Sequence, residues 1–352
     1  MWSLRANNLI KSPARWTALR SAQRRTLRYG WLGRARMPGQ PTSPFRNDRL
    51  KMEYKATLQD WFNAPRPWSF SMPGMTAVLV FIYVFLLHRQ DPITVNWLFG
   101  AISIVAVGIL QGSCNLLSDY VDYKTWVDRE DIYGSTHLVR KVFRPETVLA
   151  YALWLLFIGI AMGVLILSQT GLPILYIGIL AFIFTVFYSY FKYRAMGELV
   201  SLITYGPLVS LGTFYAMTTY LDWTVVALSL PLTFISVTTI HANNTRDILH
   251  DRRAKITTIP TLIGAKGAIL EYKIFMYGSY LLVVALVLTG MMHWITLFVM
   301  LTLPGAIRRC RIMDTATDDQ PANISDLDLK SSQFQLIFSS VLCGLFLASA
   351  WL

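Results

Sequence analysis

Nine apolar stretches, each about as long as a lipid bilayer is thick, constrain this chain more than any other feature. A helix needs roughly 20 apolar residues to cross a hydrocarbon core about 30 Å thick, where every backbone polar group must be bonded within the segment. The stretches fall near residues 69–87, 97–118, 148–168, 172–191, 199–219, 223–243, 274–289, 294–307 and 334–352. We therefore predict an all-α membrane protein with about nine transmembrane helices in one bundle.

The composition supports this class and excludes others. Hydrophobic residues make up 54% of the 352 residues and charged residues only 15%, whereas a soluble domain of this length carries more charge. The formal net charge is +12, but the basic residues gather in an N-terminal arm and in alternate loops. They therefore indicate membrane topology, and we expect no nucleic-acid partner.

Two parts of the chain differ in composition. Residues 1–60 form a basic arm, rich in Arg and Ser and interrupted by prolines, which we predict to be disordered. The arm has the composition of an organellar transit peptide, but translation from upstream of a true start at Met52 would give the same pattern. Residues 61–352 form the transmembrane domain.

Loop charges orient the predicted bundle. Lys and Arg gather after the second, fourth, sixth and eighth apolar stretches, whereas the opposite loops offer only Arg89. By the positive-inside rule, the N-terminus and the basic loops face the cytoplasm, or the matrix of an organelle, and the C-terminus faces outside. A bacterial inner membrane is the first expectation for the location, and an organellar membrane is the alternative.

Acidic clusters lie at the ends of the second and sixth apolar stretches. Each combines one asparagine with two aspartates at helical spacing: Asn115, Asp119 and Asp122 in the first, Asn244, Asp247 and Asp251 in the second. Residues three or four apart share a helix face, so each cluster forms a polar stripe. Charge at the edge of hydrocarbon is costly unless it is paired, hydrated or metal-bound, and such oxygen ligands suit Mg²⁺ bridging carboxylates to a diphosphate. Arg66, Lys192 and Arg246 could hold the remaining phosphate oxygens.

These clusters and their flanking residues resemble a known family. The run from Asn115 to Asp122, followed by Tyr123 and Lys124, and the run from Asn243 to Arg252 are similar to the two motifs of the UbiA superfamily of intramembrane prenyltransferases. The resemblance covers residues 61–352. The Asp-x-x-Asp spacing and the doubled asparagine are most similar to the 1,4-dihydroxy-2-naphthoate polyprenyltransferase branch, MenA. The resemblance implies a helix bundle around a central cavity.

The resemblance also implies a reaction and its residues. A Mg²⁺-dependent enzyme in the bilayer would transfer a polyprenyl group from polyprenyl diphosphate to an aromatic acid. The catalytic and metal-binding positions are Asp119, Asp122, Asp247 and Asp251. The substrate-binding positions are Asn115, Arg66, Lys124, Tyr188, Lys192, Asn244 and Arg246, where the Tyr188 ring would shelter an allylic cation. With 1,4-dihydroxy-2-naphthoate as acceptor, carbon dioxide is lost and a demethylmenaquinone-type product forms, a step of menaquinone biosynthesis.

Other interpretations remain open. The acceptor could be 4-hydroxybenzoate, homogentisate or a porphyrin-like ring. A cation-coupled transporter would place its carboxylates at broken helices near mid-bilayer, whereas these clusters lead directly into basic loops. The aspartates could form structural ion pairs with Lys124 or Arg252, and Arg66 and Lys192 could extend to lipid headgroups. Asn115 and Asn244 could join neighbouring helices by hydrogen bonds.

Overall fold

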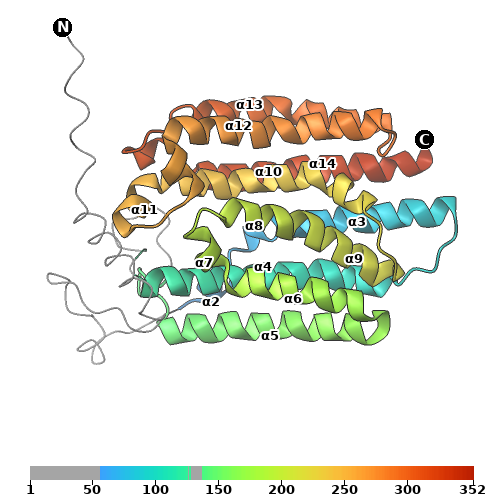
Figure 1. The fold of residues 1–352 in the computed structure, drawn as a ribbon, viewed down its shortest axis with the longest axis horizontal. Helices are drawn as coiled ribbons and strands as arrows, with labels where there is room; N and C mark the ends of the chain where they lie inside the picture. Colours follow the sequence, from blue (N-terminus) through green and yellow to red (C-terminus); the bar gives the residue numbers. More distant parts are fainter. Residues whose placement is uncertain (1–55, 126, 128–136) are drawn as a thin grey trace, which may run out of the picture. The chain divides into compact units, whose positions relative to one another are not determined.

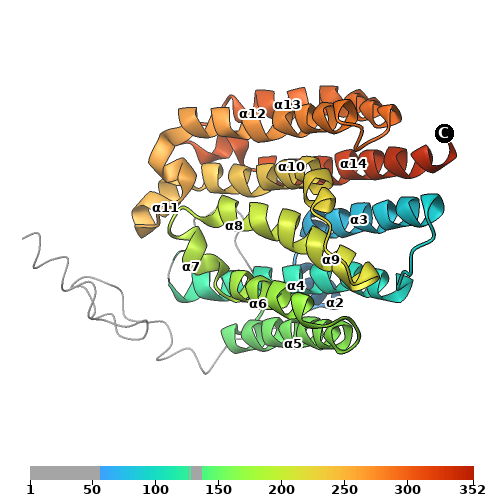
Figure 2. The same ribbon diagram turned by 45° about the vertical axis from the view of Figure 1, so that its right-hand side comes forward.

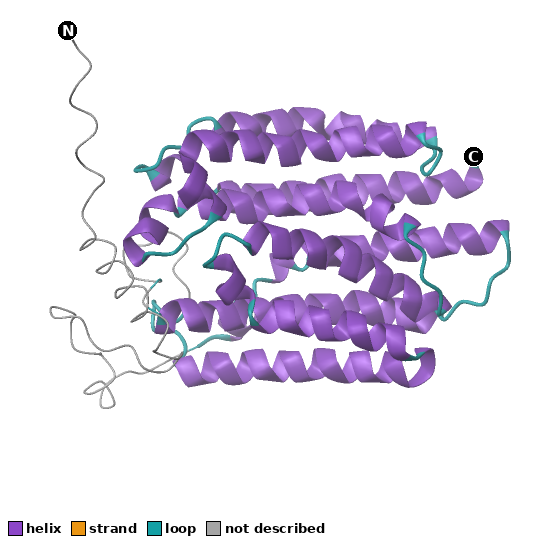
Figure 3. Cartoon of the chain, in the orientation of Figure 1, coloured by secondary structure: helices purple, strands orange, loops and turns teal. Residues whose placement is uncertain are grey.

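The described part of the chain is helical throughout. The computed structural model describes residues 56–125, 127 and 137–352, and no strand occurs in these ranges (Figure 3). The predicted N-terminal arm lies outside the described residues except for residues 56–60. There the short helix α2 (Leu58–Asn63) begins, because the Thr57 and Asp60 side chains bond each other's backbone amides in a capping box.

Nine helical segments of the described chain run alongside one another, which confirms the predicted fold class. Seven are long and apolar enough to cross a bilayer: α3 (Ser71–Gln90), α4 (Trp97–Lys124), α5 (Pro145–Thr170), α8 to α9 (Gly197–Thr218), α10 (Thr224–Arg246), α12 (Ile259–Leu288), and α14 (Leu327–Ala348) with its flanks. Two shorter segments lie beside them: α6 (Leu172–Val186), and the 3-10 helix η5 (Trp294–Thr302) continued by α13 (Leu303–Met313) (Figures 1 and 2).

Local sequence signals set several helix ends. The Asn96 side chain accepts a hydrogen bond from the Phe99 amide and caps α4, as asparagine commonly does. Pro145 opens α5, where its missing N–H removes no helical bond. Gly171, with φ of +98°, turns the chain from α5 into α6, a conformation that side chains disfavour.

Two predicted helices are interrupted, which pattern alone did not show. The stretch 199–219 contains a π-helical turn, η4 (Thr204–Leu208), around Pro207, so it divides into α8 (Gly197–Ile203) and α9 (Val209–Thr218). Proline has no N–H to donate and displaces the preceding carbonyl, which explains the local widening. Helix α12 begins at Ile259, well before the predicted 274, and Gly264 (φ +68°) kinks its first turns.

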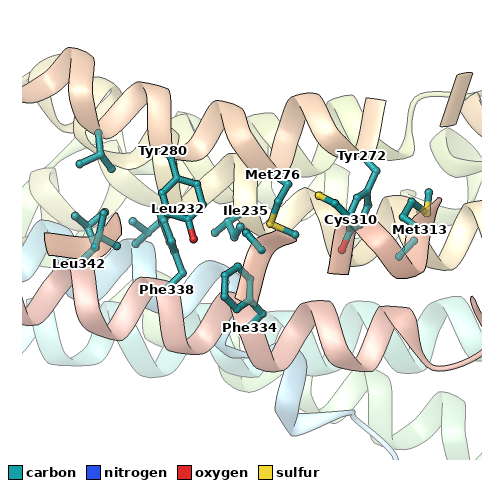
Figure 4. Packing of buried hydrophobic residues seen from close by; sticks show 14 of the residues in the cluster. Leu232, Ile235, Tyr272, Met276, Tyr280, Cys310, Met313, Phe334, Phe338 and Leu342 are labelled. Carbon is teal, nitrogen blue, oxygen red and sulfur yellow. The ribbon is translucent and has the colours of Figure 1, made fainter. Parts of the chain in front are cut away.

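One large cluster of buried apolar residues is built mainly from α10, α12 and α14, with contributions from α3, η5 and α13. Figure 4 shows Leu232 and Ile235 of α10 facing Met276 of α12 and Phe338 of α14. The outward faces of α5 and α12, by contrast, expose large apolar side chains, including Trp154, Phe157, Leu281 and Leu288. Apolar surface of this extent fits a bundle immersed in lipid.

The two acidic clusters lie at the same end of the bundle. Helix α4 ends there, and so do α10 and the short helices α7 (Tyr188–Lys192) and α11 (Ile248–Ala254) (left in Figure 1). The loop between α3 and α4 and the C-terminus lie at the opposite end (Figures 1 and 2). The topology therefore gathers the predicted site residues at one end of the helix bundle.

Candidate active site

The first acidic cluster lies on one continuous helix. Helix α4 runs unbroken through Asn115, Asp119 and Asp122, so the three side chains share a face as predicted. Asp119 is 5% exposed and Asp122 is 7% exposed, so both carboxylates are withdrawn from water. Buried carboxylates need charged or hydrogen-bonding partners, and each of these two has them.

Arg66 reaches the first of these carboxylates from the segment before α3. Its Nη2 donates to Asp119 Oδ1 at 2.5 Å. Arg66 has a φ of +57°, a left-handed conformation that costs energy for a residue with a side chain, and it precedes the single 3-10 turn η3 (Pro67–Ser69). The Asn115 amide lies against this segment and donates to the Pro65 carbonyl and to Ser69 Oγ, both at 2.8 Å.

Lys192 and Tyr193 are the partners of Asp122. Lys192 Nζ lies 3.5 Å from Asp122 Oδ2, and the Tyr193 hydroxyl donates to Asp122 Oδ1. Burial lowers the pKa of the Lys192 ammonium, but the Asp122 and Asp251 carboxylates outweigh burial and raise this pKa well above its ordinary value. Lys192 is therefore a largely buried cation, with 13% of its side chain exposed. Tyr193 was not predicted as a site residue, because a tyrosine in a basic loop has no distinctive spacing.

The second cluster does not form one helical stripe. Asp247 has φ of −90° and ψ of 5°, and it separates α10 from α11, so the helix expected through both aspartates is interrupted there. Asp251 is 3% exposed and accepts a hydrogen bond from Thr258 Oγ1 at 3.3 Å. Burial raises the pKa of Asp251 to about 7; the Lys192 charge opposes the rise, and the Asp247 and Asp122 carboxylates add to it.

The loops after α7 and α11 join the two clusters. The Ala195 amide donates to the Thr257 carbonyl at 2.7 Å, and the Thr257 amide donates to the Tyr193 carbonyl at 3.3 Å. These bonds place the partner of Asp122 beside the partner of Asp251. The structure thus brings Asp122, Lys192 and Asp251 into mutual electrostatic contact, although they are far apart in sequence.

Arg246 and Asn244 are held by other protein groups. The Arg246 guanidinium makes a bidentate pair with Asp247, at 2.9 and 3.1 Å, and its Nη1 donates to Asp328 Oδ2 at 2.7 Å. Asp328, at the start of α14, was not predicted. The Asn244 amide donates to Glu198 Oε1 of α8 at 2.9 Å. Both predicted residues therefore lie at the site and organise its second acidic cluster.

The chemistry of these carboxylates fits a hard divalent cation. Asp119, Asp122, Asp247 and Asp251 present oxygen donors of the kind that Mg²⁺ prefers, and each is neutralised by or close to Arg66, Lys192 or Arg246. Across the residues described, no three His, Cys, Asp or Glu side chains already converge as a metal site.

An apolar cavity of about 160 Å³ lies among α4, α5, α6, α8 and α9. Its walls are largely aliphatic, and its polar groups include Gln111 of α4, Tyr188 of α7 and Tyr205 of η4. Cys114 also lines the cavity, and Asp119 follows it by five residues, or about 7.5 Å along the helix. The predicted Tyr188 ring thus lies in the cavity wall.

Lys124 and Arg252 were the alternative ion-pair partners of the aspartates. Lys124 is exposed at the end of α4, and its ammonium lies 5.5 Å from the centre of the Tyr120 ring. Arg252, which could have paired with the second cluster, instead donates to Asp318 Oδ2 at 2.6 Å. In the described part of the chain, Asp119 pairs with Arg66, Asp122 with Lys192 and Asp247 with Arg246.

Comparison with known sequences gives a consistent family. The sequence pattern of the UbiA prenyltransferase family matches residues 76–331. The chain is 29% identical over 241 residues to UbiA prenyltransferase domain-containing protein 1 of Xenopus tropicalis, covering 66% of this chain and 68% of that protein. The Homo sapiens protein of the same name is 29% identical over 243 residues, covering 66% and 70%.

Solved structures share the fold. An apo UbiA homolog from Aeropyrum pernix K1 superposes with a TM-score of 0.55 at 17% identity, covering 78% of this chain and 97% of that chain. A UbiA homolog from Archaeoglobus fulgidus, bound to GPP and Mg²⁺, has a TM-score of 0.53 at 12% identity and covers 80% and 99%. At this identity, the likeness concerns the arrangement of the helices.

Proposed function

This chain belongs to the UbiA prenyltransferase family, and from that premise we propose that it transfers a polyprenyl group from polyprenyl diphosphate to an aromatic acid, 1,4-dihydroxy-2-naphthoate. The observation that carries the proposal is the position of Lys192. Its ammonium lies 3.5 Å from Asp122 Oδ2 of the first cluster and interacts electrostatically with Asp251 of the second, while the apolar cavity reaches Cys114, five residues before Asp119 on α4. A charged head and an apolar tail are the two parts of a prenyl diphosphate.

The charged groups at this end of the bundle suit a diphosphate. Arg66 and Lys192 offer N–H donors that would turn from Asp119 and Asp122 to phosphate oxygens. The four aspartates, Asp119, Asp122, Asp247 and Asp251, would hold Mg²⁺, which when bound neutralises the diphosphate and makes it a better leaving group. Support comes from the Archaeoglobus fulgidus homolog, which was solved with GPP and Mg²⁺.

The apolar cavity suits the prenyl chain. Aliphatic side chains from α4, α5, α6 and α9 form its walls, so a hydrocarbon tail would lose no hydrogen bonds on entering. Tyr188 in the cavity wall could turn its ring face to the first carbons of the chain, where positive charge develops. The position of the ring between the acidic end and the apolar walls fits that role.

The residues provide for a dissociative alkyl transfer. The allylic C–O bond breaks, and its electron pair leaves with the diphosphate, which Arg66 and Lys192 hold. The ring carbon of the acceptor gives two electrons to the allylic cation and forms the new C–C bond. In 1,4-dihydroxy-2-naphthoate the carboxylate then leaves as carbon dioxide, and its bonding electrons restore the aromatic ring.

The choice of acceptor rests on motif spacing. The Asp119-x-x-Asp122 spacing and the doubled Asn243-Asn244 favour the naphthoate, whereas 4-hydroxybenzoate and homogentisate remain the alternative acceptors of the same chemistry. The two relatives reported above come from vertebrates, so we keep an organellar membrane beside the bacterial inner membrane as the location. A transporter is disfavoured, because both clusters lie at one end of the bundle (Figure 1).

A substrate panel tests this proposal. Purified protein with Mg²⁺ and one polyprenyl diphosphate should prenylate 1,4-dihydroxy-2-naphthoate and release carbon dioxide. Asp119→Asn should abolish turnover while the protein stays folded, whereas Asp319→Asn, an exposed carboxylate at the same end of the bundle, should leave it unchanged. If only another aromatic acid were prenylated, that acid would replace 1,4-dihydroxy-2-naphthoate as the proposed acceptor. Full activity of Asp119→Asn would show that the proposed active site is wrong.

A further inference from the structure

We propose that Asn115 and Ser69 form a hydrogen-bond relay that positions Arg66 for the diphosphate. This inference rests on the diphosphate site of the proposed function. It gives a positioning role to Ser69 and to Asn115, which the resemblance had placed among the substrate-binding residues. Asn115 belongs to the first acidic cluster, yet both of its amide hydrogens are directed at the segment that carries Arg66. Ser69 lies outside both acidic clusters.

The orientation of the Asn115 amide is fixed by its neighbours. The Pro65 carbonyl can only accept a hydrogen bond, so the Asn115 nitrogen must face it, at 2.8 Å. The second hydrogen goes to Ser69 Oγ at the same distance. On the other side, Asn115 Oδ1 accepts a hydrogen bond from Gln111 Nε2 at 3.1 Å. Every hydrogen-bonding atom of the Asn115 amide therefore has a partner within the protein.

Ser69 in turn holds the backbone of Arg66 by two hydrogen bonds. Its hydroxyl donates to the Arg66 carbonyl at 2.8 Å, and its amide donates to the same carbonyl at 2.9 Å. Arg66 has a φ of +57° and a ψ of 64°, which a residue with a side chain adopts only when surrounding contacts require it. The two bonds to its carbonyl, with the Asn115 contact to Pro65, are those contacts.

Close packing holds the same segment against α4. A Cβ placed on Gly112 would lie 3.1 Å from Pro65 Cβ and 3.0 Å from Phe70 Cζ, so a larger residue here would push the segment back by a few tenths of an ångström. Asn115 is three residues further along and faces the same segment. The backbone of residues 65–69 is thus fixed to the helix that also carries Asp119, and Arg66 faces Asp119 as a result.

The relay continues to the wall of the apolar cavity. Gln111 Oε1 accepts from the Tyr205 hydroxyl at 3.1 Å, and both side chains line the cavity. A continuous path of hydrogen bonds therefore leads from the cavity through Gln111, Asn115 and Ser69 to the backbone of Arg66. In this arrangement, Arg66 is placed by groups at the cavity that would bind the prenyl chain.

A double-mutant cycle on pyrophosphate binding tests the relay. Binding of inorganic pyrophosphate with Mg²⁺ to the full-length protein in detergent is measured by calorimetry for wild type, Ser69→Ala, Arg66→Ala and the double variant. We expect Ser69→Ala to weaken binding roughly fivefold in the wild-type background and to have no effect once Arg66 is replaced. Ser69→Thr, which keeps the hydroxyl, should restore binding.

The controls separate positioning from folding and from the proposed function. Ser71→Ala removes a hydroxyl that bonds Trp68 and Gln335 instead, and should leave pyrophosphate binding unchanged. Should Ser69→Ala not fold, Gly112→Ala takes its place in the same cycle. Equal effects of the substitution with and without Arg66, or no effect in either, would overturn the relay while the function stands. Absence of pyrophosphate binding by wild type would overturn both.

Discussion

The amide of Ala195 donates a hydrogen bond to the carbonyl of Thr257, 2.7 Å away, and this contact joins the loops that follow α7 and α11. Tyr193, two residues before Ala195, bonds Asp122 of the first cluster, and Thr258, next to Thr257, bonds Asp251 of the second. A short backbone contact outside the helices therefore aligns the partners of both acidic clusters. This contact explains how a single lysine, Lys192, interacts electrostatically with carboxylates from two distant parts of the chain.

Replacing Lys192 should weaken diphosphate binding and leave two buried carboxylates without their shared cation. We expect Lys192→Met to lower kcat/KM for the polyprenyl diphosphate roughly 100-fold, the scale of a truncated buried charge pair. Lys266→Met, which removes an exposed cation at the start of α12, is the matched control and should change neither kcat nor KM. A Lys192→Met enzyme with wild-type kinetics would remove Lys192 from the diphosphate site.

Asp318 should give the protein a pH-dependent increment of stability. The Ala265 amide and then the Arg252 guanidinium lower the pKa of this carboxyl, so its ionised form is favoured in the folded state. A lowered pKa stabilises the fold above the unfolded pKa of about 4, and the increment is lost as the pH falls through the folded value. Asp318→Asn should therefore lower Tm at pH 7.

The predicted size of this effect is modest. The Asp318 side chain is 43% exposed, so solvent screening keeps the contribution below about 1 kcal/mol. Thermal unfolding of wild type and Asp318→Asn in detergent should show a gap in Tm at pH 7 that narrows toward pH 3. A gap that widens on acidification would contradict the assigned direction of the shift.

Glu198 should stabilise the bundle through Asn244. Its Oε1 accepts from the Asn244 amide at 2.9 Å and lies 3.5 Å from His241 Nδ1, in a pocket where Glu198 is 2% exposed. Glu198→Ala would leave Asn244 buried without its acceptor, at a cost of about 1–3 kcal/mol. We expect a clear loss of Tm in Glu198→Ala and a smaller one in Glu198→Gln, which keeps an acceptor oxygen.

The matched control for this prediction is Glu146→Ala, which removes an exposed carboxylate at the start of α5. Its Tm should stay within a degree or two of wild type, because surface substitutions change stability little. Equal losses in Glu146→Ala and Glu198→Ala would show that the buried contact contributes nothing specific.

The apolar cavity should discriminate prenyl donors by length. Gly178 of α6 lines the cavity, and a Cβ built there meets no atom within 4 Å, so Gly178→Leu would fill the space without a backbone clash. We expect activity with a long polyprenyl diphosphate to fall at least tenfold more than activity with dimethylallyl diphosphate. The measurement is kcat/KM for both donors.

Gly344→Leu provides the comparison, since Gly344 also has open space at its Cβ but lies on an exposed face of α14. Gly344→Leu should not change the ratio of kcat/KM between the long and the short donor. If Gly178→Leu lowered kcat/KM equally for both donors, the prenyl tail would not lie in this cavity.

The sequence was sufficient to predict the class of fold, the two acidic clusters and their location at one end of the bundle. Hydrocarbon imposes long apolar helices, so the class of fold and the approximate number of helices follow from the pattern of apolar stretches. The stripe of Asn115, Asp119 and Asp122 also followed, because a helix places residues three and four apart on one face. Substrate and metal roles of these residues stay predictions.

Tertiary structure decided which groups meet. Nothing in the spacing indicated that Tyr193 would bond Asp122, that Asp328 would bond Arg246, or that the helix would end at Asp247. These contacts depend on loops and on side chains from distant segments, and the periodic pattern of apolar residues does not predict them. Periodicity reports which face of an element is buried, whereas the pairing of charges across elements is set by the packed arrangement of the whole bundle.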